Sequence, residues 1–331
     1  MKIWIDACTG KHVRYAKAIS KRLEKLGHKT VLTTRKHPDT ILMAKRLGLN
    51  FEIVGDYNPS SLSSRFAESL IRQICFSEKF RNDKPNLLIT FQSVDACRVA
   101  FGLGVPIIST ADTPHAEKVN RLTVPLVDVL ITSSAIPEKI YKRYGATKIV
   151  TFNGVDELAW IKDHELLLEL FKVDVVVRES EFKASYNLGK QINNGTALFL
   201  TQLGEVLFLS RKYSSDDKSY MVSKNRTYPF EHYGIDLLNI MKHSGITISV
   251  GGTISRESAL LGTPSIAFGD FAVNQFLFER GFPLFIVKNN EEMLKIGMKY
   301  IHKKIDVSSL IGKLENPLDI IEKEVERFEV T

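Results

Sequence analysis

The stretch KIWIDACTGKHVRYAKAISKRLEKLGHKTVLTT, residues 2–34, sets the pattern of the fold. Its first residues, KIWID at 2–6, form an apolar run that is typical of a buried strand. Apolar residues then recur at spacings of three and four over residues 12–26, which predicts a helix that ends at Gly27. KTVLTT, residues 29–34, is expected to be the next strand. A strand, a helix and a second strand in this order favour a parallel pair joined by a crossover helix.

The same alternation continues along the first half of the chain. Further short apolar runs are expected as strands at residues 51–54, 86–90, 105–110, 126–132 and 147–152. Helical stretches separate most of these runs, as in a parallel sheet that is covered on both faces. The first half is therefore predicted to be a Rossmann-like domain.

A second alternation follows an interruption at NGVDELAWIKD, residues 153–163. Its strands are expected at residues 173–178, 205–211, 247–250, 263–268 and 283–287, and helices near 290–303 and 317–328 close the chain. We predict an α/β protein with two Rossmann-like domains in series. The expected N-terminal domain spans 1–155, the linker 156–172 and the C-terminal domain 173–331.

The composition excludes several classes of protein. The 331 residues carry a net charge of +7, no apolar run is long enough to span a membrane, and three cysteines have neither metal-ligand nor disulfide-framework spacing. The positive charge suits an acidic ligand or an anionic surface, but no basic run is interleaved with aromatics, so no specific nucleic-acid partner is expected. We expect a cytoplasmic protein whose only membrane association would be peripheral, and the oligomeric state is left open.

GGTISRESALLGTPSIAF, residues 251–268, is the stronger candidate for a ligand site because it follows a predicted strand. Gly251 and Gly252 would permit positive φ and close approach of a phosphate, with Thr253 as the N-cap of the next helix. The helix N-terminus would then face a diphosphate, and Glu257 would reach the ribose hydroxyls. The alternative is a plain strand-to-helix turn capped by Thr253.

ACTGKHVRYAKAI, residues 7–19, is the weaker candidate. His12 would start a helix at the ligand edge and act as a general base on an acceptor hydroxyl. Asp112, just after the strand predicted at 105–110, is expected to orient the imidazole. A surface or capping histidine is the alternative.

Four further residues are candidates for ligand contacts in the second half. Arg178 and Arg211 each end a predicted strand, where a guanidinium could meet phosphate oxygens or a base edge. Asn274 and Gln275 start the helix after residues 263–268 and could hydrogen-bond to sugar hydroxyls. A solvated side chain at a strand end is the alternative for the two arginines.

Two segments carry a family resemblance. GKHVRYAKAISKRLEKLGHKTVLTT and GGTISRESALLGTPSIAF resemble the opening and the donor-site segments of glycosyltransferase-B enzymes, such as peptidoglycan N-acetylglucosaminyltransferases. The second segment is also similar to that of non-hydrolysing UDP-N-acetylglucosamine 2-epimerases. MKIWID, NGVDELAWI, VVVRESEFKASYN and GGTISRESALLGTP extend a resemblance over nearly the whole chain to an archaeal and bacterial group, the domain of unknown function 354 family.

The resemblance implies an α/β protein with two Rossmann-like domains that face a central cleft, the glycosyltransferase-B fold. It also implies roles for particular residues. Gly251, Gly252 and Thr253 would hold the diphosphate, and Glu257 the ribose. His12 would correspond to the catalytic histidine of some inverting transferases, with Asp112 as its carboxylate partner. The first loop departs from the pattern, because it reads Gly-Lys-His without a second glycine and Lys11 would crowd or contact the ligand. No Asp-x-Asp metal site of the other major transferase fold is present, so neither a metal nor another cofactor is expected.

Three functions follow from these patterns. The first is transfer of a sugar from a nucleotide-diphosphate donor, with a UDP-sugar expected, to an acceptor of unknown identity, such as a lipid-linked carrier or a surface glycan. The second is a nucleotide-sugar 2-epimerase or hydrolase. Epimerisation through elimination needs several carboxylates, of which the sequence places only Glu257 and Asp112. The third is a non-catalytic nucleotide-sugar-binding protein.

Overall fold

The computed structural model describes residues 1–162, 164, 172–180, 192–210, 219–223, 226–230, 236–269 and 271–329. The chain forms two compact units. Unit 1 comprises Met1–Trp160 and Glu315–Thr331, and unit 2 comprises Ile161–Leu314. Within the described ranges, no helix combines the length and the apolar character needed to cross a bilayer.

Unit 1 is a Rossmann-like layer of seven parallel strands in the order β3-β2-β1-β4-β5-β6-β7. The strands are β1 (Lys2–Ala7), β2 (Lys29–Lys36), β3 (Glu52–Asp56), β4 (Leu87–Thr90), β5 (Ile107–Thr110), β6 (Val129–Ser133) and β7 (Ile149–Phe152). The helices are α1 (Gly10–Lys25), α2 (Pro38–Arg46), α3 (Leu62–Lys79), α4 (Val94–Gly102), α5 (Glu117–Thr123), the 3-10 turn η1 (Val124–Leu126), α6 (Lys139–Lys142), α7 (Leu158–Ile161) and α14 (Pro317–Arg327).

Aromatic packing holds α3 on the central part of the unit 1 sheet, where β1, β4, β5 and β6 are buried. Trp4 of β1 lies 4.6 Å, between ring centroids, from both Phe76 and Phe80 at the end of α3. The Trp4 indole also donates a hydrogen bond to Thr33 Oγ1 at 2.7 Å, so its one polar atom is satisfied inside the core. Contacts group α1 with α2 and α14, and α3 with α4, which in turn contacts α5.

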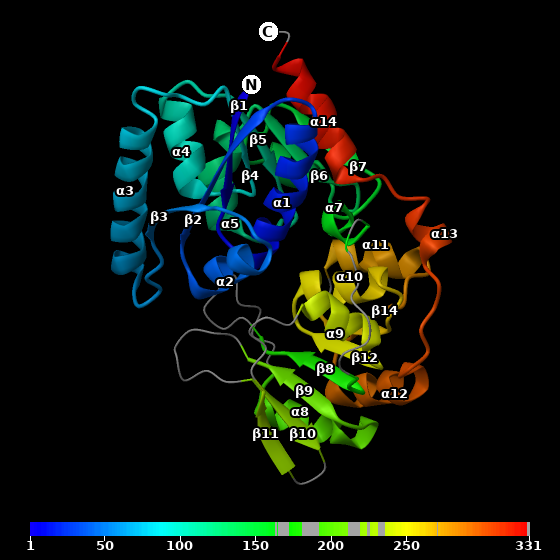
Figure 1. Cartoon of the computed structure of the whole chain (residues 1–331). Coiled ribbons are helices and arrows are strands. Elements are labelled where there is room, and N and C mark those ends of the chain that lie inside the picture. The colour runs from blue at the N-terminus through cyan, green and yellow to red at the C-terminus, as the bar shows by residue number, and fades with distance from the viewer. Residues whose placement is uncertain are drawn as a thin grey trace. The chain divides into compact units, whose positions relative to one another are not determined.

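The C-terminal helix departs from the expected domain boundaries. α14, expected in the C-terminal domain, packs on α1 of unit 1, and Figure 1 shows the red helix beside the blue one. Ion pairs hold it there, with Arg22 Nη2 2.8 Å from Asp319 Oδ1 and Lys148 paired with the buried Glu324. Asp156, expected in the linker, also belongs to unit 1. The sequence analysis assigned each helix to the domain of its neighbours along the chain, so it could not predict that α14 belongs to unit 1.

Unit 2 repeats the architecture with a mixed sheet in the order β11-β10-β9-β8-β12-β13-β14. Its strands are β8 (Val175–Arg178), β9 (Val206–Leu209), β10 (Ser219–Ser223), β11 (Arg226–Phe230), β12 (Ile246–Ser249), β13 (Ser265–Phe268) and β14 (Leu284–Val287). Its helices are α8 (Asn194–Leu200), the turn η2 (Thr201–Leu203), α9 (Leu237–His243), α10 (Gly252–Leu260), α11 (Ala272–Glu279), α12 (Asn290–Tyr300) and α13 (Ser308–Ile311). Five strands run parallel, whereas β10 and β11 add an antiparallel edge.

The strand orders locate the ligand edges. The order reverses between β1 and β4 in unit 1, and between β8 and β12 in unit 2. Ligands of open α/β sheets bind outside the carboxyl ends of the strands at such switch points. The two Rossmann-like units expected from the sequence are confirmed, whereas a cleft that both units face stays a prediction.

Candidate functional site

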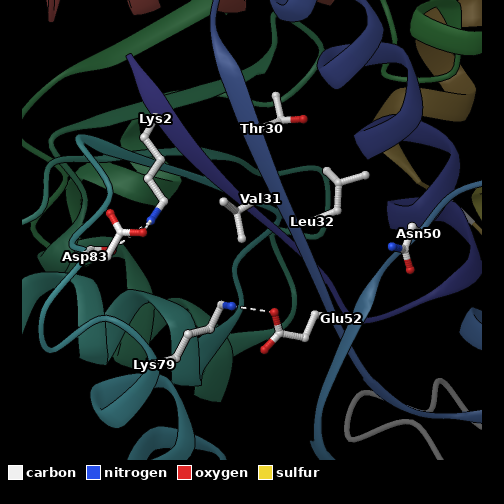
Figure 2. Close-up of a pocket in the computed structure, with 8 residues that line it drawn as sticks. All are labelled: Lys2, Thr30, Val31, Leu32, Asn50, Glu52, Lys79 and Asp83. Atoms are coloured by element: carbon white, nitrogen blue, oxygen red, sulfur yellow. Dashed lines mark hydrogen bonds and ion pairs between the residues drawn. The ribbon is translucent and has the colours of Figure 1, made fainter.

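A surface depression of about 550 Å³ lies in unit 1, at the edge of the sheet opposite to that unit's switch point, and Figure 2 shows the residues that line it. It is lined at the amino ends of the first three strands by Lys2, Thr30, Val31, Leu32, Asn50, Glu52, Lys79 and Asp83. Its charged groups already pair with one another, Lys2 Nζ with Asp83 Oδ2 at 2.5 Å and Lys79 with Glu52. Because parallel sheets bind their ligands at the opposite edge, we assign no ligand to this depression.

The switch point of unit 2 brings Arg178 and the glycine loop together. Arg178 ends β8 and is in register with Ser249, the last residue of the neighbouring β12. The loop that follows Ser249 leads directly into α10. The Arg178 guanidinium donates to the main-chain oxygen of Ser210 at 2.9 Å, so it is held next to the end of β9 as well. Arg178 and the glycine loop therefore share one edge of the unit 2 sheet.

No side chain in the described part of the chain caps the N-terminus of α10. Its N-cap residue is Gly251, in an extended conformation with φ −82° and ψ 165°. Thr253, expected to be the N-cap, lies inside the first turn, because the extended residue comes two positions earlier. The first-turn N–H groups and the positive end of the helix dipole are thus available to an anion at this edge.

The two glycines serve packing and access, not unusual backbone geometry. Neither Gly251 nor Gly252 has the positive φ that the sequence led us to expect. A Cβ at Gly251 would meet nothing within 4 Å, so this position borders open space. A Cβ at Gly252 would lie 2.0 Å from Arg256 Nη1 and 2.9 Å from its Cζ. Gly252 is therefore required by the Arg256 guanidinium that lies against it.

Arg256 is a residue of this site that the sequence analysis missed. Its side chain is buried, and its Nη1 donates to Asn274 Oδ1 at 3.4 Å at the start of α11. The contact links the first turns of α10 and α11 beneath the glycine loop. The sequence does place Arg256 one helical turn after Gly252, a spacing at which the two residues can touch. Only the structure shows that the guanidinium lies against the glycine.

The other candidates of unit 2 occupy different surroundings. Glu257 is only 3% exposed, inside α10, so a contact with a ribose hydroxyl stays a prediction. Asn274 is fully buried beside Arg256, whereas the Gln275 amide donates to Glu279 Oε1 at 2.9 Å on the surface of α11. Arg211 lies outside the described residues.

The switch point of unit 1 holds His12 in the first turn of α1. The Thr9 hydroxyl caps this helix by accepting from the His12 backbone N–H at 3.3 Å. The imidazole stacks on Phe91, just after β4, with ring centroids 4.8 Å apart. The Cys8 backbone N–H donates to His12 Nδ1 at 3.4 Å. The ring is thus fixed between the ends of the two strands that flank the switch point.

These contacts determine the protonation of His12. Burial of the ring, followed by the neighbouring Lys11 charge, lowers the pKa of His12 to about 3. The ring is therefore neutral at physiological pH, and since Nδ1 accepts from Cys8, its proton resides on Nε2. In this tautomer Nε2 carries the proton and is a hydrogen-bond donor. The general-base role stays a prediction, and it requires the ring to release Cys8 or exchange tautomer.

Lys11 gathers the carboxylates of this edge. Its Nζ lies 2.5 Å from Asp112 Oδ2, 2.9 Å from Asp156 Oδ2 and 4.0 Å from Glu157 Oε1. Asp112, expected to orient the imidazole, is thus bound by the ammonium group of Lys11. Burial, opposed by Lys11 and reinforced by the two other carboxylates, raises the pKa of Asp156. Asp156 and Glu157 were missed because their segment reads as a linker.

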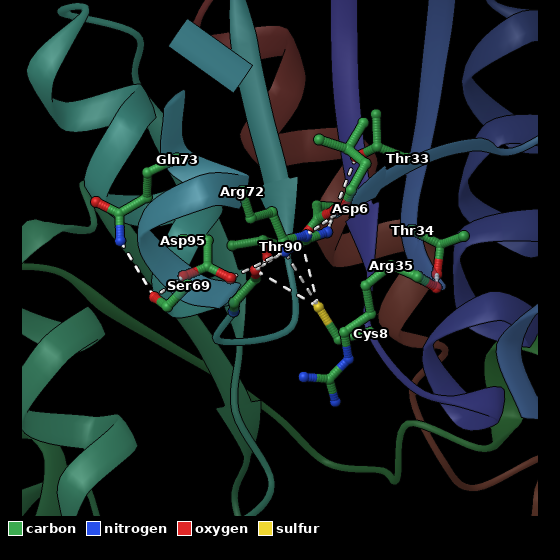
Figure 3. Close-up of polar contacts among 12 residues, drawn as sticks. Asp6, Cys8, Thr33, Thr34, Arg35, Ser69, Arg72, Gln73, Thr90 and Asp95 are labelled. Carbon is green, nitrogen blue, oxygen red and sulfur yellow. Dashed lines mark hydrogen bonds and ion pairs between the residues drawn. The ribbon is translucent and has the colours of Figure 1, made fainter. Parts of the chain in front are cut away.

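A buried ion pair between α3 and β1 lies near this edge of the sheet, and Figure 3 shows its contacts. Arg72 of α3 contacts Asp6 of β1 through two hydrogen bonds, Nη2 to Oδ1 at 2.6 Å and Nη1 to Oδ2 at 3.2 Å. Arg72 Nε also donates to the main-chain oxygen of Val54 at 2.8 Å. Burial and the Asp6 charge raise the pKa of the nearby Cys8 thiol, which stays protonated at neutral pH. Across the described residues, no group of His, Cys, Asp or Glu side chains is arranged to hold a metal ion.

Known proteins share the fold over nearly the full chain. Spinosyn forosaminyltransferase SpnP is 14% identical, with 99% of each chain covered and a TM-score of 0.61. The UDP-GlcNAc 2-epimerase of Methanocaldococcus jannaschii, solved with UDP-GlcNAc and UDP, is 15% identical over 96% of each chain, with a TM-score of 0.64. Spinosyn rhamnosyltransferase SpnG, complexed with thymidine diphosphate, is 12% identical over 98% of this chain and 99% of that one, with a TM-score of 0.57. At these identities the likeness shows the glycosyltransferase-B fold.

Sequence comparison supplies the family. An uncharacterized protein of Methanocaldococcus jannaschii is 27% identical, with 97% of this chain and 96% of that protein covered. The family model described as "Protein of unknown function (DUF354)" matches residues 1–329. The chain therefore belongs to the DUF354 family, and it has the two-domain fold that sugar transferases and UDP-GlcNAc 2-epimerases share.

Proposed function

We propose that unit 2 binds a nucleotide-diphosphate sugar and that the chain transfers the sugar without a metal ion. The observation that carries this proposal is the uncapped N-terminus of α10, which borders open space at Gly251 and lies at the switch point beside Arg178. Backbone N–H groups and a guanidinium at one edge suit the two phosphates of such a ligand. The fold neighbours support this class of ligand.

Each residue of unit 2 has a proposed part. The N–H groups of residues 252–254 hold the diphosphate, and Arg178 contacts a phosphate oxygen or the base. Arg256 and Asn274 hold the first turns of α10 and α11 in place, through the 3.4 Å contact between them. Glu257 contacts the ribose once the ligand is bound. A UDP-sugar is the proposed donor.

Transfer would break the bond between the anomeric carbon and the diphosphate, which leaves with the electron pair. The acceptor oxygen forms the new bond, and its proton passes to a base of unit 1. Asp112 is a candidate for that base, because its side chain is 25% exposed at the ligand edge. His12 would donate through Nε2 and so hold a substrate oxygen.

A second candidate function is epimerisation or hydrolysis of the same nucleotide sugar. Asp112, Asp156 and Glu157 around Lys11 favour it, since elimination and re-addition at the sugar need several carboxylates. The sequence alone did not provide this group. A non-catalytic binding protein is the third candidate, because the fold does not guarantee turnover.

Proton NMR of UDP-GlcNAc with the full-length protein in D2O, without an acceptor, distinguishes epimerisation and hydrolysis from the other two candidate functions. Exchange of the sugar C2 proton indicates epimerisation, and release of free sugar indicates hydrolysis. Binding without either change leaves transfer and passive binding, which a screen of candidate acceptors for acceptor-dependent UDP release then separates. Failure of every UDP-sugar to bind would contradict the proposed donor, and failure of the GDP-, CDP- and ADP-sugars as well would contradict the proposed function as a whole.

A further inference from the structure

Arg35 lies beside the candidate site of unit 1 and has no role in the function proposed so far. It follows Thr34, which is paired with Ala7 at the end of β1, so its backbone lies at the carboxyl edge of the sheet. Its guanidinium stacks over Tyr57, 4.3 Å from the ring centroid. Its charge also acts on both Cys8 and His12, and Figure 3 shows the Arg35 side chain next to Cys8.

Among the residues that the structure describes, the Arg35 guanidinium has no anionic partner. Within the described ranges, no hydrogen bond or ion pair of its side chain is found, and its Nε is enclosed without an acceptor. Arg72 of α3, which also contacts Cys8, is by contrast paired with Asp6, Val54 and Asp95. Arg35 is half-buried, and a partly enclosed charge without a counterion is less stable than a paired one, so an unpaired guanidinium at a ligand edge indicates that the ligand supplies the anion.

The neighbours of Arg35 suit an anion. The neutral ring of His12 carries its proton on Nε2 and adds a second donor at the same edge. Asp112, Asp156 and Glu157 are all engaged by Lys11. A guanidinium presents its donors as a planar fork that matches two oxygens of a carboxylate or a phosphate.

We propose that unit 1 binds a carboxylate or phosphate group of the second substrate against Arg35, with His12 as an additional donor. The acceptor of the proposed transfer is therefore an anionic molecule. This identification of the acceptor rests on the proposed function, whereas the anion site itself rests on the surroundings of Arg35.

The test uses NMR of the full-length protein with its histidine rings labelled and UDP present in excess. The His12 signals, assigned with the His12→Gln variant, are followed while inorganic phosphate or acetate is added. We expect a saturable shift with at least one of them, weakened about tenfold or more in Arg35→Gln. Arg98→Gln, which changes an exposed arginine on α4, is the matched control and should behave as the wild type.

Two results would overturn the anion site. One is the absence of any saturable shift with either anion, and the other is equal affinity in Arg35→Gln and the wild type. A response to phosphate alone or acetate alone identifies which anion the site prefers. If the anion binds through Arg35 but no nucleotide binds, the site stands and the proposed function fails. If nucleotides bind but no anion depends on Arg35, the proposed function stands and the site fails.

Stability provides a second readout. Because Arg35→Gln removes an uncompensated charge, we expect the melting temperature to stay the same or to rise. A large loss of stability would show that Arg35 is a structural residue, and would contradict the proposal.

Discussion

The buried ion pair between Arg72 and Asp6 allows a quantitative prediction. Both side chains are at most 1% exposed, and Arg72 donates two hydrogen bonds to Asp6 and one to the Val54 carbonyl. Arg72→Met keeps most of the side-chain volume but leaves the Asp6 carboxylate buried without its counterion. Breaking a buried pair in this way costs about 3 to 5 kcal/mol of unfolding free energy. The double variant Asp6→Asn, Arg72→Met should recover part of this loss, because no charge remains buried.

The pH dependence gives this prediction a sign. Burial alone would raise the pKa of Asp6, but Arg72 overrides it and the pKa is lowered. In the wild type, the contribution of Asp6 is present above its unfolded pKa and is lost as the pH falls. In Arg72→Met the same carboxyl titrates higher, so its charge is increasingly costly as the pH rises. The difference between wild type and variant should therefore be larger at pH 7 than at pH 4.

The assay is urea unfolding followed by tryptophan fluorescence, because both tryptophans, Trp4 and Trp160, lie in unit 1. Arg22→Met is the matched control. Its guanidinium pairs with Asp319 at 2.8 Å but is 42% exposed, and exposed pairs contribute less than about 1 kcal/mol. An Arg72→Met loss no larger than that of Arg22→Met would refute the reasoning, as would a double variant no more stable than Arg72→Met.

Three further predictions follow from the two ligand edges. Gly252→Ala forces a Cβ against Arg256, so we expect it to lower the free energy of unfolding by about 1 to 3 kcal/mol and to weaken nucleotide binding. Gly251→Ala should change the free energy of unfolding by less than about 1 kcal/mol, and equal stabilities of the two variants in denaturation would contradict this. Because the pKa of His12 is lowered, the free energy of unfolding should increase with pH between about 3 and 6.5, by up to about 1.4 kcal/mol per pH unit. Thermal melts across this range should show a smaller slope in His12→Gln. Lys11→Met removes the cation among three carboxylates. The stability lost in this variant should increase from pH 5 to pH 8, because Asp156 ionises over this range. A loss of stability that is independent of pH would contradict the role of Lys11 among these carboxylates.

The local features of the fold could be predicted from the sequence. Short apolar runs separated by helical periods predicted both Rossmann-like units, since strand and helix periods are local properties. The loop at residues 251–253 was located because glycines directly after a strand are an unusual local signal. The reason for those glycines was wrong in part, because neither has a positive φ and Gly252 makes room for Arg256.

What the sequence could not supply depends on tertiary contacts. The return of α14 to unit 1 depends on pairs such as Arg22 with Asp319, which are separated by nearly the whole chain. Asp156 and Glu157 follow an apparent interruption, and only the fold shows that Lys11 reaches them. The antiparallel pair of β10 and β11 was hidden by a polar composition, because β11 is largely exposed at the edge of its sheet.

Calorimetric titration of the full-length protein with UDP, GDP, CDP and ADP tests the central claim most directly. Gly251→Asp places a carboxylate in the open space assigned to the diphosphate, and Gly312→Asp adds the same charge at an exposed glycine with an ordinary φ of −61°. We predict saturable binding of at least one diphosphate, weakened about tenfold or more by Gly251→Asp and unchanged by Gly312→Asp. If none of the four binds at millimolar concentration, or if Gly251→Asp binds as tightly as the wild type, the N-terminus of α10 is not a nucleotide-sugar site.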